Sequence, residues 1–254
     1  MAEHPDYPRT RLYIGEKLHP SEPVMLHDEQ VHYLRDVLRL KPEGAVALFN
    51  GVDGEWLGKL RVLEKKQAIL DVISLLRPQT PTPDSWLLFA PLKQARHETV
   101  IEKASELGVR AVQAVYTKFS VVDRINSTRL ARILQESSEQ CERLDVPELL
   151  PDNKLETVLS NWDSGRALFY GDESGGGENP ASLTACPDSW ALLIGPEGGF
   201  SHRELQILRG LSFAHPISLG PRILKADTAA VAALGCLMSR LGDWHHKPSF
   251  RTAS

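Results

Sequence analysis

The sequence has few cysteines and no long apolar run, and both shortages narrow the class of protein. Only three of its 254 residues are cysteine. Cys141, Cys186 and Cys236 lie far apart and are odd in number, which argues against a disulfide framework. No segment approaches the roughly 18 apolar residues that a transmembrane helix needs, so we expect no membrane partner. The opening MAEHPDYPRT lacks the basic and apolar stretches of a secretory signal, and we expect a reduced, cytoplasmic protein.

Metal-binding and phosphate-binding motifs are also missing. None of the nine histidines lies in an HExxH motif or beside a CxxC pair, so we expect no metal. Neither GxxxxGK[ST] nor GxGxxG occurs, which disfavours nucleoside-triphosphate enzymes and dinucleotide oxidoreductases. The net charge of −4 argues mildly against nucleic-acid binding. However, eight basic residues face four acidic ones between Lys93 and Arg132, which fits either a solvated helix face or a phosphate-binding patch.

The first part of the chain is predicted to be a small, mainly β domain over residues 1–76. Three apolar or β-branched runs suit strands: residues 45–50, 56–62 and 67–73. The Asp53-Gly54 dipeptide between the first two runs favours a hairpin. One helix is expected to begin at a capping Asp28, with Val31, Leu34, Val37 and Leu38 on its apolar stripe. A small barrel with one helix fits this order. Three prolines within residues 77–83 then favour an extended connector.

Residues 77–254 alternate between strand and helix patterns, which indicates an α/β fold with a mainly parallel sheet. The expected strands cover residues 86–90, 109–115, 167–170, 192–194 and 216–219. The expected helices cover residues 96–107 and 228–241, and two more begin at Ser127 and after the capping box Ser201-His202-Arg203-Glu204. Asp227 or Thr228 is expected to cap the last helix.

Two turns rich in glycine and proline follow apolar runs in this region, at residues 195–201 and 220–224. Glycine and proline interrupt regular pairing and leave backbone N–H and C=O groups exposed. Such turns are either plain connections or the lining of a pocket for a polar cofactor. Glu197 would repel a phosphate at the helix start. An adenosine-like ligand with a neutral or cationic centre therefore suits the pocket better than a nucleoside triphosphate.

The two turns, LIGPEGGFS at 193–201 and LGPRIL at 219–224, resemble those of the RsmE family. The resemblance extends to further segments: Lys93, Arg96 and Lys103 with ELGV at 106–109, Glu139-Gln140 with Arg143 and Pro147, and VLRLKP at 37–42 with LFNG at 48–51. RsmE proteins are SPOUT-class methyltransferases that make N3-methyluridine in 16S ribosomal RNA. The chain departs from the family at Lys225-Ala226-Asp227-Thr228, where RTET is usual, and at Glu142, where glycine is frequent.

The resemblance implies a PUA-like β-barrel domain at 1–76 and a SPOUT methyltransferase domain, an α/β trefoil knot, at 77–254. It also implies S-adenosylmethionine as cofactor, a homodimer, and 16S ribosomal RNA within the small ribosomal subunit as partner. The residues expected to bind the cofactor are Gly171, Glu173, Ile194, Gly195, Pro196, Glu197, Gly198, Gly199, Leu219, Gly220, Ile223 and Leu224.

Methyl transfer to uracil N3 requires an in-line nucleophile and loss of the imide proton. We expect Arg222 to stabilise charge or anchor the substrate, Asp227 to act as the base and Thr228 to orient it. The residues expected to hold the RNA backbone are Arg9, Arg11, Arg35, Arg39, Lys93 and Arg96. Two alternatives remain: a SPOUT enzyme of the TrmH-like branch that methylates the ribose 2′-OH, and a non-catalytic RNA-binding assembly factor.

Overall fold

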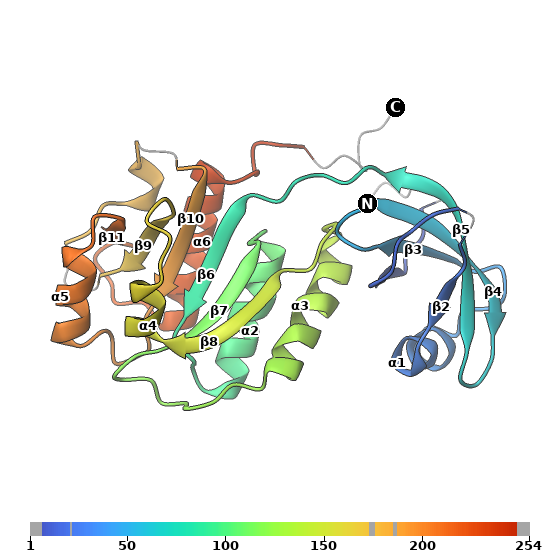
Figure 1. Cartoon of the computed structure of the whole chain (residues 1–254), viewed down its shortest axis with the longest axis horizontal. Coiled ribbons are helices and arrows are strands. Elements are labelled where there is room, and N and C mark those ends of the chain that lie inside the picture. The colour runs from blue at the N-terminus through green and yellow to red at the C-terminus, as the bar shows by residue number, and fades with distance from the viewer. Residues whose placement is uncertain (1–6, 21, 173–175, 185–186, 248–254) are drawn as a thin grey trace. The chain divides into compact units, whose positions relative to one another are not determined.

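The structure, a computed structural model, forms two units (Figure 1). The residues that it describes are 7–20, 22–172, 176–184 and 187–247. Unit 1 comprises the described residues up to Pro81 together with 138–146, and unit 2 comprises 82–137 and the described residues from 147 to 247. The sequence predicts two contiguous domains, whereas residues 138–146 group with the first unit.

Unit 1 is built on a five-stranded sheet in the order β1-β3-β4-β5-β2. Its elements are β1 (Arg11–Tyr13), β2 (Val24–Leu26), α1 (Asp28–His32), η1 (Tyr33–Val37), β3 (Ala45–Phe49), β4 (Glu55–Leu63) and β5 (Ala68–Arg77). The hairpin expected at Asp53-Gly54 joins β3 to β4, which pair antiparallel. Gly54 has a φ of +83°, and a Cβ atom there would lie 2.4 Å from the Arg77 carbonyl oxygen, so this turn requires glycine.

The helix of unit 1 differs from the predicted amphipathic pattern. After α1 it continues as the π-helical turn η1, which shifts the following side chains around the axis. Val31 and Leu34 are buried as expected, but Val37 and Leu38 are exposed. Asp28 is the first helical residue rather than the N-cap. The predicted stripe is therefore wrong in its second half, because it assumed regular α-helical spacing.

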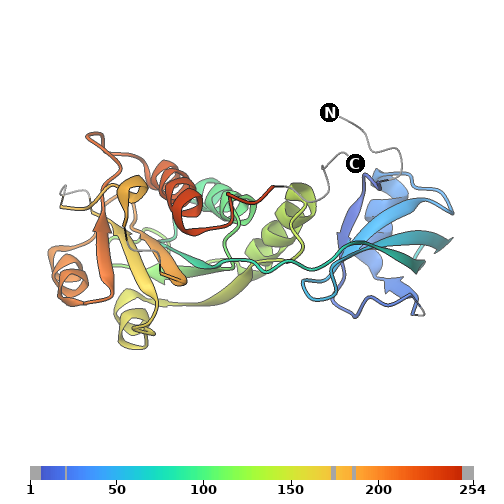
Figure 2. The same ribbon diagram turned by 90° about the horizontal axis from the view of Figure 1, so that it is seen from above.

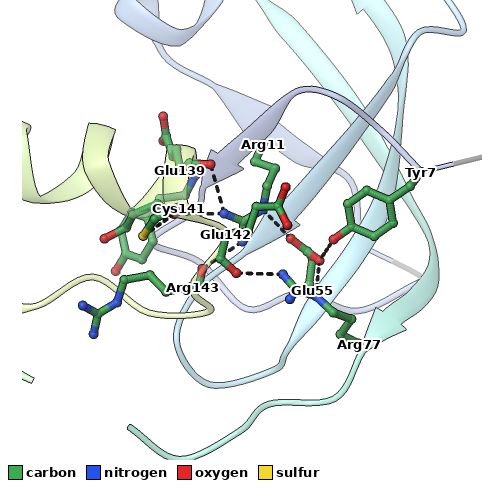
Figure 3. Close-up of polar contacts among 10 residues, drawn as sticks. Tyr7, Arg11, Glu55, Arg77, Glu139, Cys141, Glu142 and Arg143 are labelled. Carbon is green, nitrogen blue, oxygen red and sulfur yellow. Dashed lines mark hydrogen bonds and ion pairs between the residues drawn. The ribbon is translucent and has the colours of Figure 1, made fainter. Parts of the chain in front are cut away.

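Residues 138–146 are bound to unit 1 through a buried ionic cluster (Figure 3). Glu55 is 0% exposed and accepts hydrogen bonds from Arg11 Nε at 2.6 Å and Arg77 Nε at 2.7 Å. The Tyr7 hydroxyl also donates to Glu55. We call Tyr7, Arg11, Glu55 and Arg77 the Glu55 cluster. Burial alone would raise the pKa of Glu55, but the hydrogen bond from Arg77 and the charge of Arg11 outweigh it, and the pKa lies below its ordinary value.

The two arginines of the Glu55 cluster also hold the backbone at the end of helix α3 (Ser127–Cys141). Arg11 donates to the carbonyl oxygens of Ser138, Glu139 and Arg143 at 2.9, 3.0 and 2.8 Å. Arg77 donates to the carbonyl oxygen of Glu142 at 2.9 Å. Carbonyl groups at a helix C-terminus lack intrahelical partners, and arginine can satisfy them. This explains why residues 138–146 fold with unit 1.

Glu142 is expected to destabilise the fold. Its φ is +64°, in the left-handed region, and its buried Oε2 has no hydrogen-bond partner among the described residues. Glu142→Gly should therefore raise the free energy of unfolding by about 1 kcal/mol in urea titrations. Glu43→Gly is the matched control, because Glu43 has a φ of +69° but an exposed side chain. A Glu142→Gly variant no more stable than the wild type would contradict this account.

Unit 2 contains the parallel sheet that the sequence predicts, in the order β11-β9-β10-β6-β7-β8. Its elements are β6 (Asp84–Phe89), α2 (Gln94–Glu106), β7 (Ala111–Tyr116), α3 (Ser127–Cys141, whose last residues belong to unit 1), β8 (Glu148–Lys154), α4 (Leu155–Ser160), β9 (Ala167–Gly171), η2 (Pro180–Ser182), β10 (Ser189–Ile194), α5 (His202–Gly210), β11 (Ala214–Ile217) and α6 (Ala226–Leu241). All pairings are parallel. The sequence did not predict β8, because this edge strand is largely exposed and lacks an apolar pattern.

Helices cover both faces of the sheet of unit 2 (Figures 1 and 2). On one face, α4 and α5 pack through Leu155, Leu159 and Leu208 against strand residues that include Leu168 and Leu193. On the other face, α6 contacts β10 and α2. These layers leave the carboxyl ends of β9, β10 and β11 open to loops. No helix within the described ranges is long and apolar enough to span a membrane.

Candidate functional site

Loops at the carboxyl ends of β9, β10 and β11 enclose a cavity of about 370 Å³. These strands are neighbours in the sheet. Ligands of open α/β sheets bind at this edge. Of the residues expected to bind the cofactor, the following line the cavity: Gly171, Ile194, Gly195, Pro196, Glu197, Gly199, Leu219, Gly220, Ile223 and Leu224. Gly198 lies in the same loop but does not line the cavity, and Glu173 lies outside the described residues.

The glycines of these loops keep space that side chains would fill. A Cβ atom at Gly195 would lie 3.1 Å from the ring of Phe200, which itself lines the cavity. Gly220 has a φ of +99°, a conformation that other residues rarely adopt. Residues 218–225 form neither helix nor strand. The Ser218 N–H and the Lys225 carbonyl oxygen are used in backbone hydrogen bonds, and the N–H and C=O groups of residues 219–224 between them can serve a polar ligand.

The capping box expected at Ser201 is confirmed and fixes the end of the loop at 195–200. The Ser201 N–H donates to Glu204 Oε2 at 2.7 Å, and the Glu204 N–H donates to Ser201 Oγ at 3.3 Å. Both residues are buried. The capping box therefore fixes the start of α5 and, with it, the loop that forms this wall of the cavity.

Several residues that line the cavity were not among those expected to bind the cofactor, and Asp172 is the most informative of them. This buried carboxylate lines the cavity and forms an ion pair with Arg209 at 2.9 Å. Burial and the charge of Asp172 together raise the pKa of the neighbouring Tyr170. An acidic residue directly after a buried strand was the available signal. The other lining residues that were not named individually from the sequence are Phe200, Leu205, Ile217, Ser218, Pro221, Ala226 and Ala229, although Phe200 and Pro221 lie in the two expected turns.

The candidate catalytic residues lie around the last loop and the start of α6. Arg222 lines the cavity and is exposed. Asp227 and Thr228 do not line it, although Ala226 and Ala229 beside them do. The Thr228 N–H donates to Asp227 Oδ1 at 2.8 Å. The expected cap at Asp227 or Thr228 is wrong, because α6 begins at Ala226 with Lys225 as N-cap.

Arg96, expected to bind RNA, forms ion pairs with two carboxylates beside the cavity. It forms an ion pair with Glu197, and its Nε lies 3.9 Å from Asp227 Oδ2. Arg96 comes from the first turn of α2, and Glu197 from the loop after β10. The guanidinium therefore connects the cavity loop to the start of α6. Phosphate binding by Arg96 would have to compete with both acidic partners.

The other residues expected to bind RNA differ in their exposure. Arg11 is 6% exposed and belongs to the Glu55 cluster, which corrects its expected role, because a buried guanidinium with internal partners cannot reach a phosphate. Arg35 pairs with Asp36 and donates to the Lys65 carbonyl oxygen at 2.7 Å. The remaining residues, which are exposed, are Arg9, Arg39 and Lys93.

The described part of the chain holds no group of three or more His, Cys, Asp or Glu residues arranged to bind a metal ion.

Two family models match separate parts of the chain. Residues 78–238 match the RNA methyltransferase domain, and residues 26–73 match the RNA methyltransferase PUA domain. Ribosomal RNA small subunit methyltransferase E of Rickettsia conorii is 30% identical over 228 residues, which cover 88% of this chain and 93% of that protein. Its namesake from Buchnera aphidicola subsp. Schizaphis graminum is 27% identical over 247 residues, with 92% and 97% covered.

A solved structure is also similar over nearly the whole chain. It is ribosomal RNA small subunit methyltransferase E from Neisseria gonorrhoeae bound to S-adenosyl methionine, with a TM-score of 0.85 and 27% identity, covering 92% of this chain and 99% of that one. Together with the match over residues 78–238, these likenesses show that the chain belongs to the ribosomal RNA small subunit methyltransferase E family of RNA methyltransferases, the family named RsmE above.

Proposed function

We propose that this protein transfers a methyl group from S-adenosylmethionine to N3 of a uridine in 16S ribosomal RNA. The observation that carries the proposal is the cavity of about 370 Å³ at the ends of β9, β10 and β11. Its size falls within the range of about 300–1,000 Å³ that is usual for small-molecule sites. The relative from Neisseria gonorrhoeae, which has a similar fold, was crystallised with S-adenosyl methionine.

The residues of the cavity fit this cofactor. Ile223 and Leu224 offer apolar surface for an adenine ring, and the loop at 219–224 offers backbone groups for its polar edge. Asp172 and Glu197 are carboxylates that can accept hydrogen bonds from ribose hydroxyls and complement a positive charge. When bound, the cofactor would supply an electrophilic methyl group. The absence of a phosphate-binding motif agrees with a ligand that has no phosphates.

Side chains near the start of α6 are suited to removing the proton from N3 of the uracil imide. In the proposed reaction Asp227 accepts the N3 proton, and the Thr228 N–H fixes one of its oxygens at 2.8 Å. Arg96 holds the other oxygen, Oδ2, from a distance of 3.9 Å. Arg222 stabilises the negative charge that develops on the uracil.

The finer parts of the proposal rest on the family resemblance. These are the choice of uracil N3, the trefoil knot, the homodimer, and the small ribosomal subunit as the setting of the reaction. The exposed Arg9, Arg39 and Lys93, together with Arg35, would contact the RNA backbone.

Calorimetry and a transfer assay test the proposal. S-adenosylmethionine is titrated into the protein, and tritiated methyl transfer is then measured on small subunits from a strain that lacks the gene. We expect binding to a single class of site and incorporation of label into 16S ribosomal RNA. Absence of cofactor binding would favour the non-catalytic assembly factor.

Ile223 provides a local test of the cofactor site, because its side chain is 84% exposed and yet lines the cavity. Ile223→Ala removes apolar surface that a bound adenine would cover. We expect the Kd for S-adenosylmethionine to rise about tenfold with an unchanged Tm. Val52→Ala in the β3–β4 turn of unit 1, also strongly exposed, should change neither quantity. An unchanged Kd for Ile223→Ala would remove Ile223 from the site.

A further inference from the structure

An exposed aromatic ring lies next to the loop that forms one wall of the cavity. Phe119 follows β7 and is 44% exposed, although its own unit contains a large apolar core. A Cβ atom at Gly198 would lie 3.2 Å from Phe119 Cβ and 3.6 Å from its Cγ. Glu197 and Gly199, on either side of Gly198, line the cavity. Phe119 therefore packs on the loop at 195–200 at Gly198, the residue of that loop that does not line the cavity.

The turn that carries Phe119 is held in place by several hydrogen bonds. Within the turn, the Thr117 N–H donates to Ser120 Oγ at 2.9 Å, and the Ser120 N–H donates to the Thr117 carbonyl oxygen at 3.2 Å. The Lys118 N–H donates at 2.8 Å to Oε1 of the buried Glu204, whose other oxygen closes the capping box of α5. The same carboxylate therefore fixes both the cavity loop and the turn at 117–120. The ring is presented by a well-supported backbone despite its exposure.

We propose that Phe119 is a stacking platform for an unpaired nucleobase of the RNA substrate at the entrance to the methylation site. This inference rests on the proposed function and names how the base is held. A base that is modified on its pairing edge must leave the helical stack. Proteins hold such bases by stacking them on aromatic side chains, which offer a flat apolar face to any base. Phe119 offers such a face beside the proposed cofactor site.

The positive charge of Lys118 beside the ring favours RNA over an apolar protein segment as the occupant. Lys118 Nζ lies 5.5 Å from the centre of the Phe119 ring. Arg124, farther along the same loop, is exposed. A positive side chain beside an aromatic ring can contact a phosphate that flanks a stacked base. The ring also lies against the loop at 195–200, so a base stacked on the ring would lie beside that loop.

Substitutions at Phe119 separate stacking from simple apolar contact. Phe119→Leu keeps an apolar side chain but removes the aromatic face, and Phe119→Trp keeps that face. Val121→Ala, at an exposed apolar residue of the same loop, is the matched control. For each variant we would measure the kcat/KM for small-subunit RNA, the affinity for single-stranded RNA by fluorescence anisotropy, and the Kd for S-adenosylmethionine.

We expect Phe119→Leu to lower the kcat/KM for RNA about 5- to 100-fold and to weaken RNA binding, with the cofactor Kd unchanged. Phe119→Trp should restore most of the loss, and Val121→Ala should resemble the wild type. A kcat/KM for Phe119→Leu equal to that of the wild type would overturn the inference. A parallel rise in the cofactor Kd would also overturn it, because Phe119 would then only support the loop at Gly198. If the wild type itself does not methylate RNA, the proposed function fails, while the RNA affinities still test stacking.

Discussion

Glu55→Gln is expected to lower the free energy of unfolding of unit 1 by about 3–5 kcal/mol. Glu55 is fully buried and is the acidic partner of both Arg11 and Arg77, whose side chains are 4% and 8% exposed. Glutamine would remove the buried negative charge that Arg11 and Arg77 share. Tyr7, Arg11 and Arg77 all donate hydrogen bonds to the Glu55 carboxylate. The NH₂ group of a glutamine side chain cannot accept such a bond and would face at least one of these donors. Hydrogen exchange of the β3, β4 and β5 amides measures this loss within unit 1.

The pH dependence of this loss has a defined sign. The pKa of Glu55 in the folded state lies below its ordinary value. Its contribution to stability is therefore complete above the unfolded-state pKa and is lost as the pH falls through the folded-state pKa. The stability difference between the wild type and Glu55→Gln should shrink in acid for this reason.

An exposed ion pair of the same unit is the control for Glu55→Gln. Arg61 Nη1 lies 3.0 Å from Asp71 Oδ1, and the two side chains are 49% and 38% exposed. Asp71→Asn should cost no more than about 1 kcal/mol, because water already solvates both groups. Equal effects of the two substitutions would contradict a structural role for the Glu55 cluster.

Gly177→Ala is expected to weaken binding of S-adenosylmethionine about 5- to 100-fold and to lower the Tm. A Cβ atom at Gly177 would lie 2.4 Å from the carbonyl carbon of Ile217 and 2.6 Å from its N and Cα. These are backbone atoms, so no side-chain rotation relieves the clash. The residue after Gly177 is also hydrogen-bonded to the end of β11. The Glu178 N–H donates to the Pro216 carbonyl oxygen, and the Ser218 N–H donates to the Glu178 carbonyl oxygen. Ile217 and Ser218 line the cavity, so the displacement moves its wall.

The neighbouring glycine gives a control that differs only in its surroundings. A Cβ atom at Gly176 would meet its nearest neighbour, Asp172 Oδ2, at 3.8 Å, which is ordinary contact. Gly176→Ala should therefore bind the cofactor within about twofold of the wild type. If calorimetry shows that Gly177→Ala binds as tightly as Gly176→Ala, the wall of the cavity does not depend on this contact.

The cofactor loops could be located from the sequence because their signals are local. A strand of apolar residues followed at once by glycine and proline identifies both the end of the strand and a break in backbone pairing, as at Ile194-Gly195-Pro196 and Leu219-Gly220-Pro221. Nine of the residues expected to bind the cofactor in these two loops line the cavity. Leu205 was missed because its approach to the cavity depends on how α5 packs, which no nearby residue records.

The role of Arg11 could not be predicted because its partners are far away in the sequence. Its Nη1 donates to the carbonyl oxygen of Ser138, 127 positions later, and its Nε donates to Glu55, 44 positions later. In the sequence, nothing distinguishes Arg11 from the other arginines of a domain that is expected to bind RNA. The misplaced stripe of the first helix has a different cause, since the π-helical turn at 33–37 departs from the spacing that the pattern assumes.

The most direct test of the proposed reaction is the chemical identity of the methylated nucleoside. Small subunits from a strain that lacks the gene are incubated with the protein and S-adenosylmethionine, and their 16S ribosomal RNA is digested to nucleosides for mass spectrometry. A reaction without the cofactor provides the baseline. We expect N3-methyluridine as the new product. A ribose 2′-O-methylated nucleoside, or no new methylated nucleoside, would contradict the proposed function.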